Sequence, residues 1–182
     1  QTAYAILMEA LAPARERVFI VHRLDRESSG VLLLAKTEAA KQAAMSHWKA
    51  AEKVYHALVE GTPEARSATL VHHLTEDNRL KMHAADAPSR GSQEARLSYQ
   101  LVRASHQYAM LSVELDTGRK NQIRVQLATI GHPIAGDEKY GATMNPLGRL
   151  GLHASRLALP HPVTGEMLVI EAPLPDVMAG YC

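Results

Sequence analysis

The chain has 182 residues, which fits one domain of ordinary size, and 46% of them are hydrophobic, which is enough for a full core. Its formal net charge is only +1, so a site for a polyanion must come from local clustering of lysine and arginine. The one cysteine, Cys182, excludes an intramolecular disulfide and a cysteine-based zinc site, and no apolar run approaches the ~18 residues that a membrane span needs.

The N-terminal part of the chain alternates predicted helices and strands. Helical spacing of apolar residues, β-branched runs and a threonine N-cap are the signals used. In chain order they predict a helix over 3–11, strands over 17–24 and 30–36, a helix over 38–51 capped by Thr37, and a strand over 53–60.

The C-terminal part is richer in predicted strands. Residues 62–93 are polar and full of turns, with short strands such as Ala68–His73. Further on, the patterns predict an antiparallel pair over 94–104 and 108–117, a helix over 121–130, and strands over 151–159 and 167–172. Many strands with a few interspersed helices indicate an α+β fold with a mostly antiparallel, mixed sheet and flanking helices.

The stretch VHRLDRESSG (21–30) places an aspartate where a predicted strand ends. Asp25 enters a tight loop in which serines and a glycine supply turn residues and backbone donors. Taken alone, Asp25 is compatible with a structural role, as a turn cap or as the partner of Arg23 or Arg26. A chemical role is the alternative, and the loop by itself does not decide between them.

The stretch DTGRKNQIRVQL (116–127) predicts a strand end, a glycine turn and a helix start. Arg119 and Lys120 lie near the helix N-terminus, where the dipole disfavours cations, so their placement favours an anionic partner such as phosphate. Arg124 shares the apolar face of its i+3 and i+4 neighbours, so its guanidinium should point inward and need a carboxylate. That carboxylate could be a structural acid or Asp25.

The strand KVYHALVEG (53–61) contains one tyrosine. In strict alternation Lys53, Tyr55 and Ala57 share one face. A lone tyrosine in a strand usually fills a core, and a place in a site is the alternative.

Several common catalytic patterns are missing from the sequence. The ten histidines lack metal-ligand spacing, and there is no phosphate-cradling glycine loop of the Walker or Rossmann type. There is no Gly-x-Ser-x-Gly turn, and Asp25 with Glu27 on one short loop is a poor carboxylate pair for a glycosidase. We therefore expect no metal and no cofactor.

Taken together, these stretches resemble the RluA-type RNA pseudouridine synthases. The similar blocks spread over residues 17–172 and keep the family's order: HRLDRESSGVLLLAKT (22–37), KVYHALVEG (53–61), TGRKNQIRVQLATIGHPIAGDEKYG (117–141) and GRLGLHASRLALPHPVTGE (148–166). The family usually begins with a further segment, and this chain starts at Gln1, so we expect residues 1–182 to be its catalytic domain without that N-terminal segment. Lys120-Asn121-Gln122 stands where Thr/Ser-His-Gln is frequent.

The resemblance implies a pseudouridine synthase fold with a central catalytic cleft, and the isomerisation of specific uridines in ribosomal or transfer RNA. Asp25 would be the nucleophile, Arg124 the cation that keeps it ionised, and Tyr55 the ring that stacks on uracil and moves a proton. The uridine would be extruded from its stack, with Arg23 filling the gap or holding its phosphate. A cytoplasmic monomer without membrane contact is expected.

The RNA path is expected to be one cleft with Asp25 at its floor, lined by Arg23, Arg26, Arg119, Lys120, Arg149 and Arg156. The competing interpretation is that these cations are ordinary solvated surface charges. At the level of function, the alternative is a non-catalytic RNA-binding or ribosome-assembly module with the same fold. An inactive descendant would be expected to lose Asp25, Tyr55 or Arg124, and all of them are present.

Overall fold

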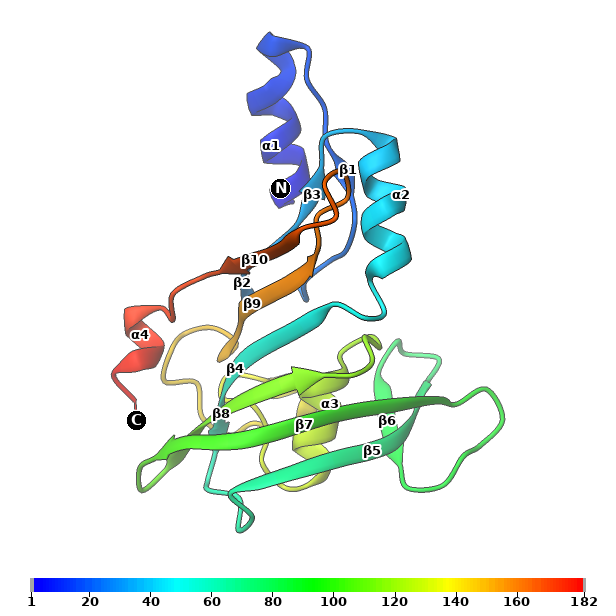
Figure 1. The fold of residues 1–182 in the computed structure, drawn as a ribbon. Coiled ribbons are helices and arrows are strands. Elements are labelled where there is room, and N and C mark those ends of the chain that lie inside the picture. Colours follow the sequence, from blue (N-terminus) through cyan, green and yellow to red (C-terminus); the bar gives the residue numbers. More distant parts are fainter. Residues whose placement is uncertain (1, 182) are drawn as a thin grey trace.

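The computed structural model describes residues 2–181 and confirms the α+β class (Figure 1). Within these residues, eight strands form one sheet, in the order β10-β9-β4-β8-β7-β5-β6, with β2 added beside β9. All neighbours are antiparallel except β2 and β9, which are parallel. Their bounds are β2 (Ser29–Gly30), β4 (Glu52–Glu60), β5 (Ser67–Glu76), β6 (Met82–Ala85), β7 (Gln93–Ala104), β8 (Tyr108–Leu115), β9 (Leu152–Pro160) and β10 (Met167–Glu171).

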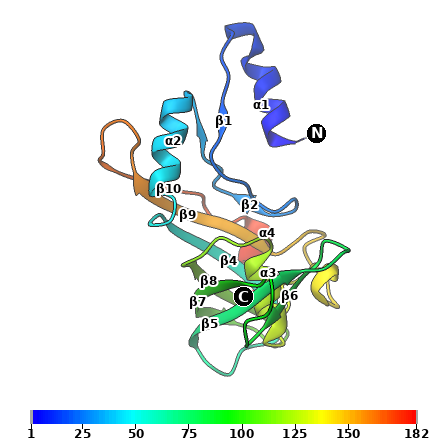
Figure 2. The same ribbon diagram turned by 90° about the vertical axis from the view of Figure 1, so that its right-hand side faces the viewer.

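The helices lie in two separate regions around this sheet. Figures 1 and 2 show α3 against the part formed by β4 to β7, whereas α1 and α2 lie beyond β9 and β10. A short pair of strands connects α1 to α2. The bounds are α1 (Ala3–Leu11), β1 (Phe19–Ile20), β3 (Leu34–Ala35), α2 (Glu38–His47), α3 (Gln122–Thr129), α4 (Asp176–Ala179), and the 3-10 turns η1 (Ala12–Ala14) and η2 (Glu138–Tyr140). No helix in residues 2–181 is both long and apolar enough to cross a membrane.

The main core lies between the centre of the sheet and α3. Inward residues of β7 alternate with exposed ones, as expected for an antiparallel strand with one solvated face. Ile123 and Leu127 of α3 pack against this face, and Leu111 of β8 is fully buried there. Burial of each such side chain contributes about 1.5–3 kcal/mol, which fixes α3, and therefore Arg124, against the sheet.

Several element boundaries differ from the sequence-based expectation. Strands are predicted over 17–24 and 30–36, but the structure forms only the two-residue strands β1, β2 and β3 there, because most of this backbone has no neighbouring strand. For example, the Leu33 amide donates to the His22 ring (2.8 Å) and not to a ladder partner. The helix predicted over 38–51 begins at the Thr37 cap as expected, but it ends at His47, where Trp48 bonds back three residues to Met45. Strand β6 and helix α4 were not predicted individually.

Gly30 is the point where the Asp25 loop is fastened to the sheet. It pairs with Ala154 of β9, and the following Val31 amide donates to the Ala154 carbonyl (2.9 Å). Its φ is +110°, and a Cβ placed here would lie 2.1 Å from the Ala154 carbonyl oxygen. Glycine is therefore required twice, by the backbone conformation and by the close approach of β9.

We predict that Gly30→Ala lowers the free energy of unfolding by at least about 2 kcal/mol, because it combines backbone strain with a clash against backbone. Urea denaturation measures this. Gly165→Ala is the matched control, since Gly165 also has a positive φ (+76°), but a Cβ placed there would have nothing within 4 Å. If both variants lose the same stability, the contact with β9 is unimportant.

Candidate active site

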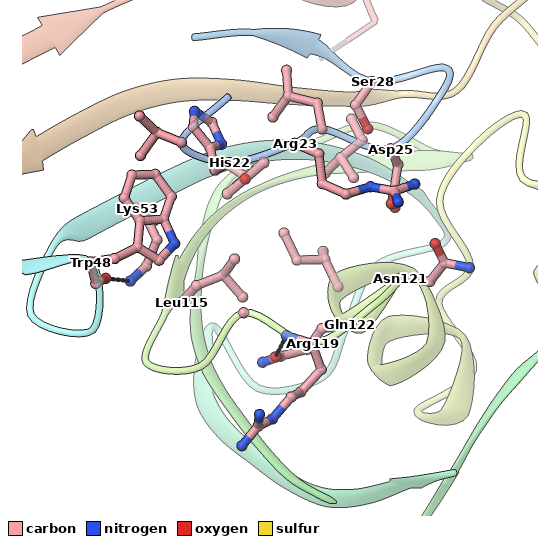
Figure 3. A pocket seen from close by; sticks show the side chains of 16 residues that line it. His22, Arg23, Asp25, Ser28, Trp48, Lys53, Leu115, Arg119, Asn121 and Gln122 are labelled. Atoms are coloured by element: carbon pink, nitrogen blue, oxygen red, sulfur yellow. Dashed lines mark hydrogen bonds between the residues drawn. The ribbon is translucent and has the colours of Figure 1, made fainter. Parts of the chain in front are cut away.

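Asp25 lies on the wall of a cavity of about 260 Å³ between the N-terminal loop and the sheet (Figure 3). The loop after β1 forms one wall, from Val21 to Ser28. Lys53 and Tyr55 of β4 contribute another, and the residues that lead into α3 complete it. Two segments far apart in sequence, residues 21–28 and 118–123, therefore face the same space, as the resemblance implied.

Arg124 contacts Asp25 and a second carboxylate. Its Nη1 lies 3.7 Å from Asp25 Oδ2, and both side chains are largely buried, at 13% and 22% exposed. Its shorter bonds, however, go to Asp137: Nε to Oδ2 and Nη2 to Oδ1, both 2.7 Å. The inward orientation of Arg124 is confirmed, and both partners that the sequence left open, a structural acid and Asp25, are present.

This charge arrangement opposes full stabilisation of the Asp25 carboxylate. Burial raises the pKa of Asp25, the guanidinium groups of Arg124 and Arg23 lower it, and the negative charge of Asp137 raises it; the net pKa lies above the ordinary value. Burial by itself would lower the pKa of Arg124, but its hydrogen bonds to Asp137 and the negative charge of Asp25 raise it overall. Arg124 thus stays charged while Asp25 is only partly compensated.

Asn121, which the sequence analysis named only within a departure from the family's pattern and not as a site residue, supplies hydrogen bonds to Asp25. A carboxylate can only accept, so the amide turns its nitrogen to Asp25, 3.1 Å from Oδ1 and 3.2 Å from Oδ2. The amide oxygen then accepts from the Tyr140 hydroxyl (2.9 Å), which itself accepts from the Met82 amide (3.2 Å). Asn121 is 9% exposed and adopts the left-handed conformation (φ 51°), which asparagine tolerates better than most residues.

Tyr55 both lines the cavity and packs on the main core, so the two interpretations of this tyrosine coexist. Burial, and next the negative charge of Asp25, raise the pKa of Tyr55 to about 12. Its hydroxyl therefore keeps its proton at neutral pH.

The other end of the cavity is built from rings. His22 stacks at a tilt on Trp48, with ring centroids 4.6 Å apart. Its Nε2 accepts the Leu33 amide, and burial lowers the pKa of His22 to about 4, so the ring is neutral at pH 7. His22 thus shapes the wall and does not add charge to it.

The cations expected to line the cleft do not all reach it. Arg23 is exposed and borders the cavity, close to Asp25 (Figure 3). Arg119 also borders it, but its guanidinium points away, and Nε donates to the Glu94 carbonyl (3.0 Å). The remaining expected cations, Arg26, Lys120, Arg149 and Arg156, are not among the residues that line this cavity, and their place on an RNA path stays a prediction. Arg156 borders a small neighbouring cavity, which shares Lys53 and Tyr55 with the first.

Two of those remaining cations already have carboxylate partners. Lys120 pairs with Glu76, and Arg156 donates to Glu52 (2.8 Å) and to Glu171 (2.5 Å). Arg149 lies near the Asp25 loop, with Nη2 3.4 Å from the Glu27 carbonyl oxygen. Among residues 2–181, no group of three histidine, cysteine, aspartate or glutamate side chains is arranged to hold a metal.

We predict that Asn121→Gly raises the pKa of Asp25 further. Glycine keeps the left-handed backbone and removes only the amide, so the ionised carboxylate loses its donor while the neutral acid loses little. A ¹³C NMR titration of the Asp25 carboxyl carbon measures the change. Asn78→Gly, at an exposed turn, is the control and should leave that pKa alone. An unchanged or lower pKa in Asn121→Gly would contradict the assigned hydrogen bonds.

Comparison with known proteins identifies similar sequences. A family model described as RNA pseudouridylate synthase matches residues 6–129. An uncharacterized RNA pseudouridine synthase, YhcT of Bacillus subtilis, is 34% identical over 166 residues, or 89% of this chain and 54% of that protein. Ribosomal large subunit pseudouridine synthase D of Nitrosomonas europaea is 37% identical over 177 residues, or 90% of this chain and 50% of that protein.

Solved structures share the fold. The human RNA pseudouridylate synthase domain containing 4 aligns with a TM-score of 0.78 at 26% identity, covering 97% of this chain and 79% of that one. The human RNA pseudouridylate synthase domain containing 1 also gives 0.78, at 23% identity, covering 92% and 73%. The chain spans about half the length of the curated relatives it matches. Because the family model covers more than half of the 182 residues, the chain belongs to the RNA pseudouridylate synthase family.

Proposed function

We propose that this chain is the catalytic part of an enzyme that isomerises uridine to pseudouridine in RNA, with Asp25 as its nucleophile. The observation that carries the proposal is the position of Asp25: a carboxylate on the wall of a cavity, bonded by Asn121 and facing Arg124. Arg124 in turn donates to Asp137, and Asn121 accepts a hydrogen bond from Tyr140, so both partners of Asp25 are held in position. Such an arrangement orients one partly buried carboxylate and leaves it able to ionise.

The reaction breaks the bond between C1′ and N1, turns the uracil, and joins C5 to C1′. Every heavy atom stays within one nucleotide: C5 loses its hydrogen as a proton when it joins C1′, and N1, released from C1′, gains a proton. The uridine must leave its stack to reach Asp25, at a cost of a few kcal/mol. Arg23, exposed beside Asp25, is suited to hold the phosphate of the extruded nucleotide or to fill the gap it leaves.

Tyr55 is the group proposed to face the uracil. Its ring borders the cavity, and its hydroxyl is protonated at neutral pH, so it can donate a hydrogen bond or a proton. Ribosomal or transfer RNA as substrate, action in the cytoplasm and a monomeric state are parts of the same proposal. The non-catalytic RNA-binding module remains the second candidate, because it would use the same fold and cations.

We predict that Asp25→Asn lowers tritium release from [5-³H]uridine-labelled RNA by at least about three orders of magnitude, as for other lost nucleophiles, while RNA binding persists. Release of tritium by the unmodified chain is expected for an isomerase and not for a non-catalytic RNA-binding module, so the same assay separates the two candidate functions. Asp86→Asn is the control, because that carboxylate is 98% exposed. Activity of Asp25→Asn within tenfold of the unmodified chain would refute the assignment.

The role of the Tyr55 hydroxyl is tested separately from that of its ring. Tyr55→Phe keeps the stacking face and removes the hydroxyl, whereas Tyr55→Leu removes both. If the hydroxyl moves a proton, we expect Tyr55→Phe to lose about 10²–10⁴-fold in tritium release. If only Tyr55→Leu is impaired, the ring stacks and another group handles the proton.

A further inference from the structure

Lys53 is a buried lysine on the cavity wall, and the proposed chemistry does not use it. It is 8% exposed, although it borders the cavity beside Tyr55. Figure 3 shows Lys53 with Trp48 on the side of the cavity opposite Asp25. The two charged groups therefore face different parts of whatever occupies the space.

The protein gives this ammonium group no counter-charge at contact distance. Nζ donates to the Trp48 carbonyl (3.2 Å) and lies 5.9 Å from the centroid of the Trp48 ring. No carboxylate of residues 2–181 lies within ion-pair distance of Lys53. The negative charge of Asp116 acts on Lys53 from farther away, and the Asp116 carboxylate accepts a hydrogen bond from Arg96 (2.9 Å). Burial lowers the pKa of Lys53, and Asp116 only partly offsets that effect.

A buried, uncompensated cation is costly, and a methionine or leucine would fill the same wall without that cost. Lysine at this position is therefore explained best by an anion that enters with the ligand. Of the cations that border the cavity, Arg119 points away, so Arg23 and Lys53 are the ones that can face a bound strand. They stand at its two ends, with Arg23 beside Asp25.

We propose that Lys53 binds a backbone phosphate of the RNA strand, at the end of the cavity away from the reacting uridine. This inference rests on the proposed function, which supplies the RNA. Lys53 then fixes the register of the strand: one phosphate near Arg23, another at Lys53, and the reacting nucleotide on the Asp25 side. The class of ligand is a phosphodiester, and the lysine is a binding residue that does not touch the reacting atoms.

The test is Lys53→Met, which keeps the length of the side chain and removes the charge. The probe is transcribed, unmodified ribosomal RNA, bound to the chain at several salt concentrations. Loss of one phosphate contact should lower the slope of log K against log salt by about 0.7 and weaken binding roughly tenfold or more. Lys53→Arg should restore most of the slope, because it restores the charge.

Lys36→Met is the matched control, since Lys36 is 81% exposed and does not border the cavity; its slope should stay within error of the unmodified chain. Thermal unfolding is measured in parallel. The midpoint of Lys53→Met should be unchanged or raised, because a buried charge has been removed. A lowered midpoint with unchanged binding would mean that Lys53 serves only to hold the Trp48 carbonyl, and would overturn the proposal.

Two further outcomes are decisive. Weaker binding with an unchanged salt slope would mean that Lys53 contacts a base and not a phosphate, which overturns the proposal. Tritium release by the unmodified chain is recorded with the same ribosomal RNA and, separately, with transcribed transfer RNA. If that release is absent while Lys53→Met still flattens the slope, the proposed function fails and the Lys53 contact stands; if release is present and the slope is unchanged, only the Lys53 contact fails.

Discussion

The site depends on the guanidinium of Arg124, which contacts two carboxylates. Arg124 directs its two short, parallel hydrogen bonds to Asp137, which is 1% exposed, and meets Asp25 at 3.7 Å. Asp137 therefore sets the plane and position of Arg124, and Arg124 gives Asp25 a nearby positive charge without a tight, competing bond. Burial raises the pKa of Asp25, and the negative charge of Asp137 adds a smaller increase, which explains why that pKa lies above its ordinary value even beside an arginine. A carboxylate so placed keeps lone pairs available to a substrate.

The same cluster is tied together by the segment that follows α3. The turn η2 and the residue before it supply both Asp137 and Tyr140, so one short stretch of chain holds the two groups that hold Asp25. The Tyr140 hydroxyl also receives the Met82 amide of β6, and the Arg124 guanidinium lies 5.2 Å from the Tyr140 ring. Because each polar group is fixed by another, the geometry around Asp25 is set before any ligand binds. Gly30, on the other side, lets the loop that carries Asp25 approach β9.

Sequence patterns predicted those features that are local or that recur as motifs. The helix Ala3–Leu11 and the Thr37 cap follow from spacing and capping, and both are confirmed. The neighbourhood of Asp25 and Arg124 was expected from the family resemblance, since no periodicity connects residues a hundred positions apart. Asn121 could not be found by propensity, because its role comes from a left-handed turn at a helix start and from Tyr140 behind it. The strand expected over 17–24 has the right composition but lacks a partner along most of its length, which no local pattern reports.

The ion-pair partners of the cations could not be predicted from the sequence either. Counting cations in motifs grouped Arg156 and Lys120 with Arg23, yet the fold gives Arg156 two glutamates and Lys120 one. Exposed pairs of this kind are worth only about 0–1 kcal/mol each, so phosphate can compete for Lys120 at little cost, whereas Arg156 would have to leave both partners. Lys53 escaped the count because a lysine in an alternating strand is normally solvated. Lys53, however, is buried on a cavity wall and has no carboxylate at contact distance. Such a cation indicates an anionic ligand more specifically than several surface cations that already have carboxylate partners.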